Sequence, residues 1–424
     1  MRLATDLVDP VEMSGKDSMR VGYGVALRSR EYRALLTSQF VSVCGTSVAY
    51  VALTILVYRR TGSPLLASLT FALGFLPFVL GGGLLSGIVD RVRPRRLVVG
   101  CDLASAALAT TMAVPSIPVA VLLAQVLVIG TLLSLSSGAR AELVRTSVSR
   151  EAYVPARSLI RVAVQFAQIG GNAVGGALLL LLTPSGALLV NASSFLFSAT
   201  VIRLVVADHA NEGEPSGRPL LRDSLGGARD VFRHGELRRL LLLGWLVPMF
   251  TVAPEALAAP YVSAQGGSTA LVGWWLVALP VGLIAGDVAG VRLLTLRRQR
   301  LLVAPAAAAS FVPYLFFAAE PSIAAALALL VAAGACGLYS LGLDGRVRDA
   351  APPELFARAM TLNTAGLMTL QGLGFVLAGA LAQAFGPANA IALAGCCGLA
   401  ATVVLMGREL RPARSARPAT EMPR

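Results

Sequence analysis

The sequence predicts an all-α integral membrane protein with twelve transmembrane helices, arranged as two parallel, pseudo-symmetric six-helix bundles. Three observations predict this fold: long apolar segments, basic residues confined to one side of them, and an internal repeat. The chain has 424 residues, of which 56% are hydrophobic and 14% charged, and its mean hydropathy is +0.72. Because a soluble domain usually carries about 25% charged residues, the composition indicates a protein embedded in lipid.

The apolar segments are each long enough to cross a membrane. At about 1.5 Å per residue, about 20 helical residues cross a hydrocarbon core of about 30 Å. The segments cover residues 34–58, 65–89, 97–116, 119–139, 159–182, 186–206, 239–262, 270–296, 301–319, 322–344, 358–384 and 388–407. With twelve crossings, both termini lie on the same side of the membrane.

The basic residues determine which side that is. All Lys and Arg residues except Arg59 and Arg60 fall before the first segment, after the last one, or in or beside alternate loops. Since Lys and Arg concentrate in cytoplasmic loops, both termini are predicted to be cytoplasmic. Abundant Ala and Arg with a single lysine suggest a GC-rich bacterial genome, so we expect a bacterial plasma membrane. The net charge of +13 then reflects membrane topology, and nucleic acid is not expected as a partner.

The regions between and around the apolar segments divide the chain. Residues 1–33 have no apolar core before their arginines, so we interpret them as a cytoplasmic tail and not a signal peptide. Two six-helix halves are predicted at 34–207 and 239–407, with a second tail at 408–424. The linker 208–238 places apolar residues at helical spacing among arginines, which predicts an amphipathic helix on the membrane surface.

The two halves repeat one another at a constant offset of 203 residues. The landmarks Leu76-Pro77, Gln168, Gly171, Gly176-Ala177-Leu178 and Pro184 recur as Leu279-Pro280, Gln371, Gly374, Gly379-Ala380-Leu381 and Pro387. An even number of helices per half makes the repeat parallel, with its axis along the membrane normal. Such halves rock against one another around a central site near the middle of the membrane.

Two motifs resemble those of the major facilitator superfamily. The loop after the second segment, Gly87-Ile88-Val89-Asp90-Arg91-Val92-Arg93-Pro94-Arg95-Arg96, resembles the signature loop of that superfamily, although Ser86 takes the position of a usual glycine. The run Ala167-Gln168-Ile169-Gly170-Gly171-Asn172-Ala173-Val174-Gly175-Gly176 resembles its antiporter motif, with Ala167 and Asn172 replacing a glycine and a proline. The glycines also suit close helix packing.

A closer resemblance covers nearly the whole chain. Residues 155–198 and the run Val252-Ala253-Pro254-Glu255-Ala256-Leu257 resemble the macrolide-efflux and enterobactin-exporter-like branch of that superfamily. The resemblance implies a monomeric transporter in the lipid bilayer that exports a drug, secondary metabolite or siderophore, driven by protons and without cofactor or metal. An importer or a transport-inactive sensor of the same fold is the alternative. An integral-membrane enzyme is less favoured, because Walker, paired acidic and His/Cys patterns are absent from the sequence.

Carboxylates within apolar segments are the strongest site candidates, since each costs about 2.5–3.5 kcal/mol at the middle of a membrane. Glu255 lies beside Pro254 and one turn after Thr251, with Pro248 about two turns earlier, so this helix is predicted to kink or break beside the charge. Glu255 is expected to serve proton coupling or substrate contact, with a buried structural carboxyl as the alternative. Asp287 is expected to pair with Arg292 one turn away.

Further residues are predicted to line the cavity or close the inner gate. Cavity candidates are polar residues at helical spacing, for which helix packing is the alternative role. They are Thr251, Ser42, Thr46, Gln168, Asn172, Asn363 and Gln371. The inner-gate candidates are Asp90, Arg91, Arg95, Asp102 and Arg140. No catalytic residue is expected.

Overall fold

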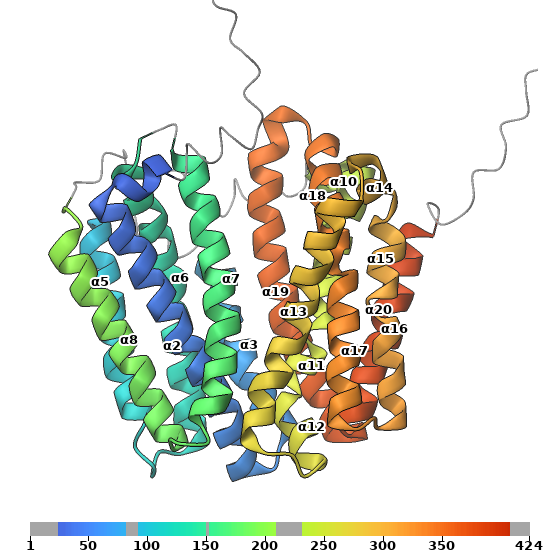
Figure 1. Ribbon diagram of the computed structural model, residues 1–424, viewed down its shortest axis with the longest axis horizontal. Helices are drawn as coiled ribbons and strands as arrows, with labels where there is room; N and C mark the ends of the chain where they lie inside the picture. Colours follow the sequence, from blue (N-terminus) through green and yellow to red (C-terminus); the bar gives the residue numbers. More distant parts are fainter. Residues whose placement is uncertain (1–23, 82–91, 150–151, 209–230, 408–424) are drawn as a thin grey trace, which may run out of the picture.

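The computed structural model describes residues 24–81, 92–149, 152–208 and 231–407, and all regular elements in these residues are helices. Figure 1 shows them gathered into two bundles side by side. The first bundle contains α2 (Arg30–Thr61), α3 (Pro64–Gly81), α5 (Pro94–Met112), α6 (Val119–Ser147), α7 (Tyr153–Leu178) and α8 (Pro184–Val205). The second contains α10 (Gly235–Thr251), α11 (Ala253–Ala256), α12 (Ala258–Ala264), α13 (Thr269–Leu293), α14 (Leu296–Leu301), α15 (Val303–Ala309), α16 (Val312–Leu315), η1 (Phe316–Ala319), α17 (Ile323–Ala335), η2 (Cys336–Leu338), α18 (Tyr339–Ala350), α19 (Pro353–Phe385) and α20 (Pro387–Met406).

The membrane crossings of the second bundle are partly built from short helices. The groups α10–α12, α14–η1 and α17–α18 each correspond to one predicted apolar segment. The described residues therefore form six crossings per bundle. Eight helical segments are long and apolar enough to cross a membrane by length and composition alone, and Pro64–Pro77 and Val303–Ala319 are shorter apolar helices. The predicted twelve-helix, two-bundle fold is confirmed. Most of the predicted linker, residues 209–230, lies outside the described residues.

Local sequence explains where the helices begin and end. The Ser29 hydroxyl accepts a hydrogen bond from the Tyr32 amide at 3.2 Å and caps the start of α2. Gly62 ends α2 with a φ of 63°, a left-handed conformation that glycine adopts without steric cost. Thr183 caps α8 through the Gly186 amide, and Pro184 follows at the first helical position, where a missing N–H costs nothing.

Packing between the bundles follows the sequence repeat. In the contacts between the two bundles, α3 packs on α19 and α7 packs on α13. An offset of 203 residues maps α3 onto α13 and α7 onto α19. The contact between α3 and α19 is therefore the repeat counterpart of the contact between α13 and α7. The bundles are therefore related by a pseudo-two-fold axis, as a parallel repeat requires.

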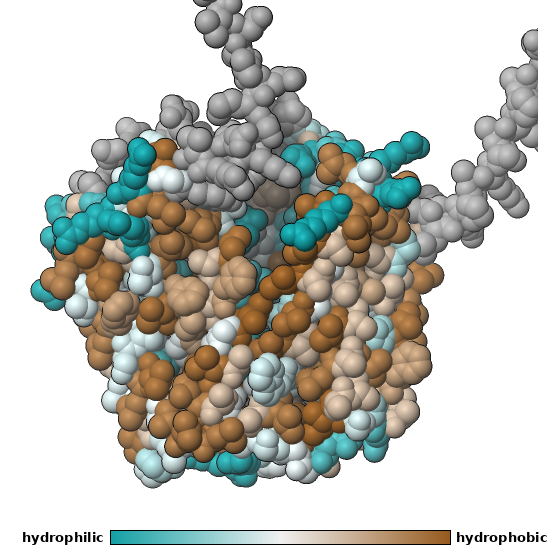
Figure 2. All heavy atoms as spheres, in the orientation of Figure 1, coloured by the Kyte–Doolittle hydropathy of each residue, from teal (hydrophilic) through white to brown (hydrophobic). Residues whose placement is uncertain are grey.

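The bundles approach one another closely at the end where α2 ends and α13 begins. We call the end that carries Arg93, Arg95 and Arg298 the arginine-rich end, and the other the opposite end. Near the opposite end, Arg59 donates to the Thr269 hydroxyl at 3.1 Å and Ser63 donates to Gln383 at 2.8 Å, each across the two bundles. Figure 2 shows apolar side chains covering the middle of the molecule, with hydrophilic ones gathered toward both ends. This band matches the predicted span of the lipid core.

Candidate functional site

Three prolines shape the helix that carries Glu255. Pro248, Pro254 and Pro260 lack the amide hydrogen that an α-helix needs, and the segment divides into α10, α11 and α12 around them. Helical backbone hydrogen bonds remain between these prolines. For example, the Ala256 amide donates to the Val252 carbonyl at 2.9 Å. The Trp275 indole also donates to the Pro254 carbonyl at 2.7 Å. The predicted interruption is confirmed, and it places Glu255 on a separate short helix.

Glu255 lies where the two bundles meet. Its short helix α11 contacts α3 of the first bundle as well as α19 and α20 of the second. The side chain is half-buried and close enough to Tyr50 and Tyr314 to act on both phenols electrostatically. Within the described part of the chain, it has no hydrogen bond or ion pair. Glu255 is thus an uncompensated carboxylate in a membrane protein, which makes it the strongest candidate for a functional group.

The groups around Glu255 are held in place by aromatic and backbone contacts. The Tyr314 hydroxyl donates to the Thr251 carbonyl at 3.0 Å. The Thr251 hydroxyl donates to the Pro248 carbonyl at 3.2 Å, so this predicted cavity residue also supports its own helix. Tyr50 stacks on Phe71, and Phe71 stacks on Phe375 of the second bundle with centroids 5.2 Å apart. An aromatic layer therefore connects the bundles beside the carboxylate.

Asp287 and Asp344 form a second acidic group, and Asp344 is not among the residues singled out from the sequence. Asp344 on α18 interacts electrostatically with Asp287 on α13 and with Arg161 of the first bundle. The predicted pair between Asp287 and Arg292 is not present among the described residues, and one oxygen of Asp287 is buried without a hydrogen-bond partner there. Asp344 stands at the end of the predicted apolar segment 322–344. It is exposed, and its interaction with Arg161 crosses between the bundles.

Asp102 and Arg140 form an ion pair inside the first bundle. Arg140 contacts both oxygens of Asp102, at 2.7 and 3.0 Å, and the Asp102 side chain is only 1% exposed. Ser198 donates to Asp102 at 2.6 Å and accepts from Arg140 at 3.0 Å, so the pair joins α5, α6 and α8. Asp102 lies close in sequence to Arg95 and Arg96. The geometry instead makes Arg140 its partner within one bundle.

The other inner-gate candidates lie apart from this pair. Arg95 donates to the Arg203 carbonyl at 2.6 Å, at the arginine-rich ends of α5 and α8. Asp90 and Arg91 lie outside the described residues. The role of these residues in a gate therefore stays a prediction.

Several of the predicted cavity residues make contacts inside one bundle. Ser42 is buried, and the Thr46 hydroxyl donates to the Ser42 carbonyl at 2.9 Å and lies 3.5 Å from the Asn191 amide oxygen. Asn363 accepts a hydrogen bond at 3.1 Å from the Trp245 indole. These contacts hold helices together.

Within the described residues, the side chains of Gln168, Asn172 and Gln371 make no hydrogen bond. Gln168 is exposed, while Asn172 and Gln371 are half-buried. Gln168 on α7 and Gln371 on α19 are also counterparts in the repeat. Their contact with a substrate stays a prediction.

The glycines of the antiporter-like motif, residues 167–176 on α7, serve packing at three of their positions. A Cβ at Gly171 would lie 2.7 Å from the Cys44 carbonyl, and one at Gly175 would lie 3.1 Å from the Val48 Cα, so both allow α7 to approach α2. Gly176 faces Gly273 of the second bundle, whereas Gly170 has open space around it. The packing role considered for this motif thus accounts for three of its glycines.

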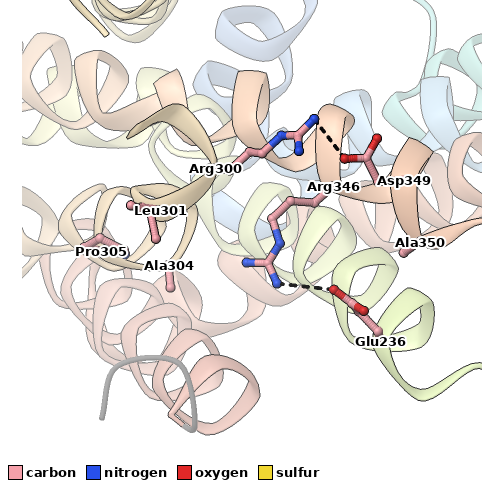
Figure 3. Close-up of a pocket in the computed structure, with 8 residues that line it drawn as sticks. All are labelled: Glu236, Arg300, Leu301, Ala304, Pro305, Arg346, Asp349 and Ala350. Atoms are coloured by element: carbon pink, nitrogen blue, oxygen red, sulfur yellow. Dashed lines mark ion pairs between the residues drawn. The ribbon is translucent and has the colours of Figure 1, made fainter. Parts of the chain in front are cut away.

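A charged cavity of about 710 Å³ lies at the arginine-rich end of the second bundle. Figure 3 shows Arg300 directed at Asp349, a pair 2.8 Å apart, and Arg346 reaching toward Glu236 at 3.7 Å. Glu31 corresponds to Glu236 at an offset of 205 residues, two more than the main repeat. It accepts a hydrogen bond from Ser147 and so joins the start of α2 to the end of α6. Charged contacts therefore fix helix ends in both bundles, and this cavity is separate from Glu255. No group of His, Cys, Asp or Glu in the described ranges could hold a metal ion.

Comparisons with known proteins agree with this architecture. The family described as transmembrane secretion effector matches residues 24–423. No curated protein matches the chain.

Among solved structures, the nucleoside transporter NupG is 12% identical, with coverage of 89% of this chain and 99% of that one, and a TM-score of 0.70. A bacterial homolog of the human lysosomal transporter Spinster, in an inward-facing and unoccupied conformation, is 16% identical, with 90% and 95% covered and a TM-score of 0.65. The peptide transporter POT in complex with sulfate is 15% identical, with 92% and 97% covered and a TM-score of 0.66. At these identities the likeness establishes the fold alone.

Proposed function

Because the chain belongs to the transmembrane secretion effector family and is a membrane transporter of the major facilitator type, we propose that it exports small organic molecules by alternating access, coupled to protons. The observation that carries this proposal is Glu255, a carboxylate without a charge partner among the described residues, at the junction of the two bundles. In a rocking transporter, such a group is reached from one side of the membrane and then from the other. It can therefore carry a proton across.

One proton carried on one carboxylate supplies enough energy to drive substrate export. At a membrane potential of about 100 mV, moving one elementary charge supplies about 2.3 kcal/mol, which corresponds to about a fifty-fold substrate gradient. The chain needs no second titrating group for a gradient of that size. Export of a drug, secondary metabolite or siderophore is the substrate class we propose, with Gln168, Asn172 and Gln371 as contacts.

The contacts between the bundles support a state that is open toward the arginine-rich end. The hydrogen bonds from Arg59 to Thr269 and from Ser63 to Gln383 hold the opposite end together. If the arginine-rich end faces the cytoplasm, as the positive-inside rule predicts, substrate enters from the cytoplasm in this state. This is the loading state of an exporter.

We expect Glu255→Gln to lower proton-driven efflux at least ten-fold, because the amide cannot take up or release a proton. Efflux of candidate compounds from preloaded vesicles, with and without a protonophore, measures this. Glu320→Gln, which neutralises an exposed carboxylate outside the helix core, is the matched control and should keep wild-type efflux. Proton coupling is wrong if a protonophore leaves wild-type efflux unchanged, and net uptake of the compound would favour an importer.

We expect both termini to be cytoplasmic, which single cysteines introduced into a cysteine-free variant can test. Ser268 and Arg298 are both exposed and lie at opposite ends of the second bundle. A membrane-impermeant maleimide should label Ser268→Cys in intact cells and Arg298→Cys only after the cells are permeabilised. The reverse labelling pattern would place the arginine-rich end outside and contradict the proposed direction of loading.

A further inference from the structure

A basic pocket of about 390 Å³ lies between the arginine-rich ends of α5 and α8. It is lined by Arg95, Arg96, Val99, Gly100, Leu103, Arg203 and Asp208. Figure 1 shows α5 and α8 at the edge of the first bundle that faces away from the second bundle. Their packing partners are helices of the first bundle, so the pocket opens to the surroundings of the protein and not to the transport pathway.

The charges in this pocket are unbalanced. Three arginines line it against one carboxylate, Asp208, which accepts hydrogen bonds from Arg93 at 3.0 Å and from Arg96 at 3.1 Å. The hydrogen bond from Arg93 is the main cause that lowers the pKa of Asp208, so this carboxylate stays charged at neutral pH. After Asp208 is counted, the lining carries a formal excess of two positive charges. The Arg203 side chain has no partner among the described residues.

An apolar surface continues from the pocket toward the middle of the membrane. Leu103, within the pocket, is 44% exposed, and Leu204 and Leu196 on α8 are 76% and 48% exposed. Leucines exposed on an outer face at membrane depth contact acyl chains. A ligand that fits this surface therefore has an anionic head and an apolar tail.

We propose that this pocket binds the phosphate headgroup of an anionic phospholipid, with one acyl chain lying along α5 and α8. Guanidinium groups bind phosphate through two parallel hydrogen bonds, and basic pockets between helices at the cytoplasmic surface suit lipid headgroups. Arg203 and Arg95 supply the charge, while Gly100 leaves room for the headgroup, because a Cβ there would meet nothing within 4 Å.

The second bundle does not repeat this pocket. At the 203-residue offset, Arg95 corresponds to Arg298, but Arg96 corresponds to Gln299, which is buried and donates to the Gly290 carbonyl at 3.1 Å. Arg203 corresponds to Met406, which is 1% exposed. The lipid is therefore expected on one bundle only. Arg298, which is exposed at the same end of the molecule, provides a matched control.

Native mass spectrometry of the purified full-length chain tests the proposal, with phosphatidylglycerol as the probe and phosphatidylcholine as the neutral lipid. We expect one phosphatidylglycerol to bind preferentially to the wild type. Arg203→Gln should weaken this binding about five-fold, the contribution of one basic residue near an anionic surface. Gly100→Leu, which fills the pocket and keeps every charge, should weaken it at least as much. Arg298→Gln should bind as the wild type does.

Three results would overturn the proposal. Equal losses in Arg298→Gln and Arg203→Gln would indicate diffuse attraction to the whole basic surface. Unchanged binding in Gly100→Leu would show that the lipid does not enter the pocket. Displacement of the lipid by inorganic phosphate at the same concentration would indicate a site for free anions. Because these measurements do not involve transport, they stand apart from the test of proton coupling at Glu255.

Discussion

Replacing Gly176 with leucine should separate the two bundles where α7 packs on α13 and reduce transport at least ten-fold. A Cβ at Gly176 would lie 2.6 Å from the Cα of Gly273 and 2.9 Å from the Ala270 carbonyl oxygen. These are backbone atoms of α13, so they cannot rotate away as a side chain would. Overpacking of this kind costs about 1–3 kcal/mol. The cost falls only on the state in which α7 touches α13, so it shifts the population toward the other state.

A cross-link at the same end of the molecule measures this shift directly. The Ser63 and Gln383 side chains are 2.8 Å apart across the bundles, so cysteines at these positions in a cysteine-free variant should cross-link efficiently. We expect Gly176→Leu to reduce that cross-linking. Gly170→Leu is the control on the same helix, because a Cβ at Gly170 meets nothing within 4 Å. If the two variants transport and cross-link equally well, this contact does not hold the bundles together.

The repeat offers an independent copy of this experiment. Gly379, the counterpart of Gly176, lies against Ser68 and Leu65 of the first bundle, and a Cβ there would be 2.9 Å from the Leu65 Cα. The pseudo-two-fold axis relates these two contacts. Gly379→Leu is therefore expected to shift the same equilibrium in the same direction.

Replacing Asp102 with asparagine should strongly destabilise the first bundle. The change leaves the Arg140 guanidinium, 11% exposed, without its buried counter-charge. Removing one partner of a buried ion pair costs about 3–5 kcal/mol, which corresponds to a fall in Tm on the order of 10 °C. Thermal unfolding of the purified protein, followed by light scattering or intrinsic fluorescence, measures this fall.

A double variant separates the loss of the pair from the loss of an unmatched charge. Combining Asp102→Asn with Arg140→Gln removes both charges and keeps hydrogen-bonding groups, so it should recover most of the lost Tm. Glu142→Gln is the control, because the Glu142–Arg145 pair is partly exposed and contributes about 1 kcal/mol or less. A Tm of Asp102→Asn equal to that of the wild type would contradict the buried-pair interpretation. If the double variant recovers stability but not transport, the pair also acts in the gate.

The architecture could be predicted well from the sequence because the membrane imposes it. A hydrocarbon core demands long apolar helices, and the repeat at 203 residues indicates which helices correspond. The break beside Glu255 could also be predicted, since prolines disrupt backbone hydrogen bonds wherever they stand in a helix. These features depend on local sequence and membrane thickness alone.

The partners of the charged residues were harder to predict. Asp102 lies six residues from Arg96 in sequence, yet its partner Arg140 comes from another helix. Periodicity places a residue on a helix face but does not say which helix packs on that face. For the same reason, the interaction of Asp344 with Arg161 of the other bundle was not predicted.

The two bundles share a repeat, but they should differ in stiffness. The first bundle is braced by the Asp102–Arg140 pair, whose counterparts in the second bundle are the apolar Pro305 and Leu343. The second bundle is also the one whose crossings α10–α12, α14–η1 and α17–α18 are interrupted. Interrupted helices bend more easily than continuous ones. We therefore expect the second bundle to flex around a nearly rigid first bundle during each cycle, so that a symmetric sequence pattern gives an asymmetric motion.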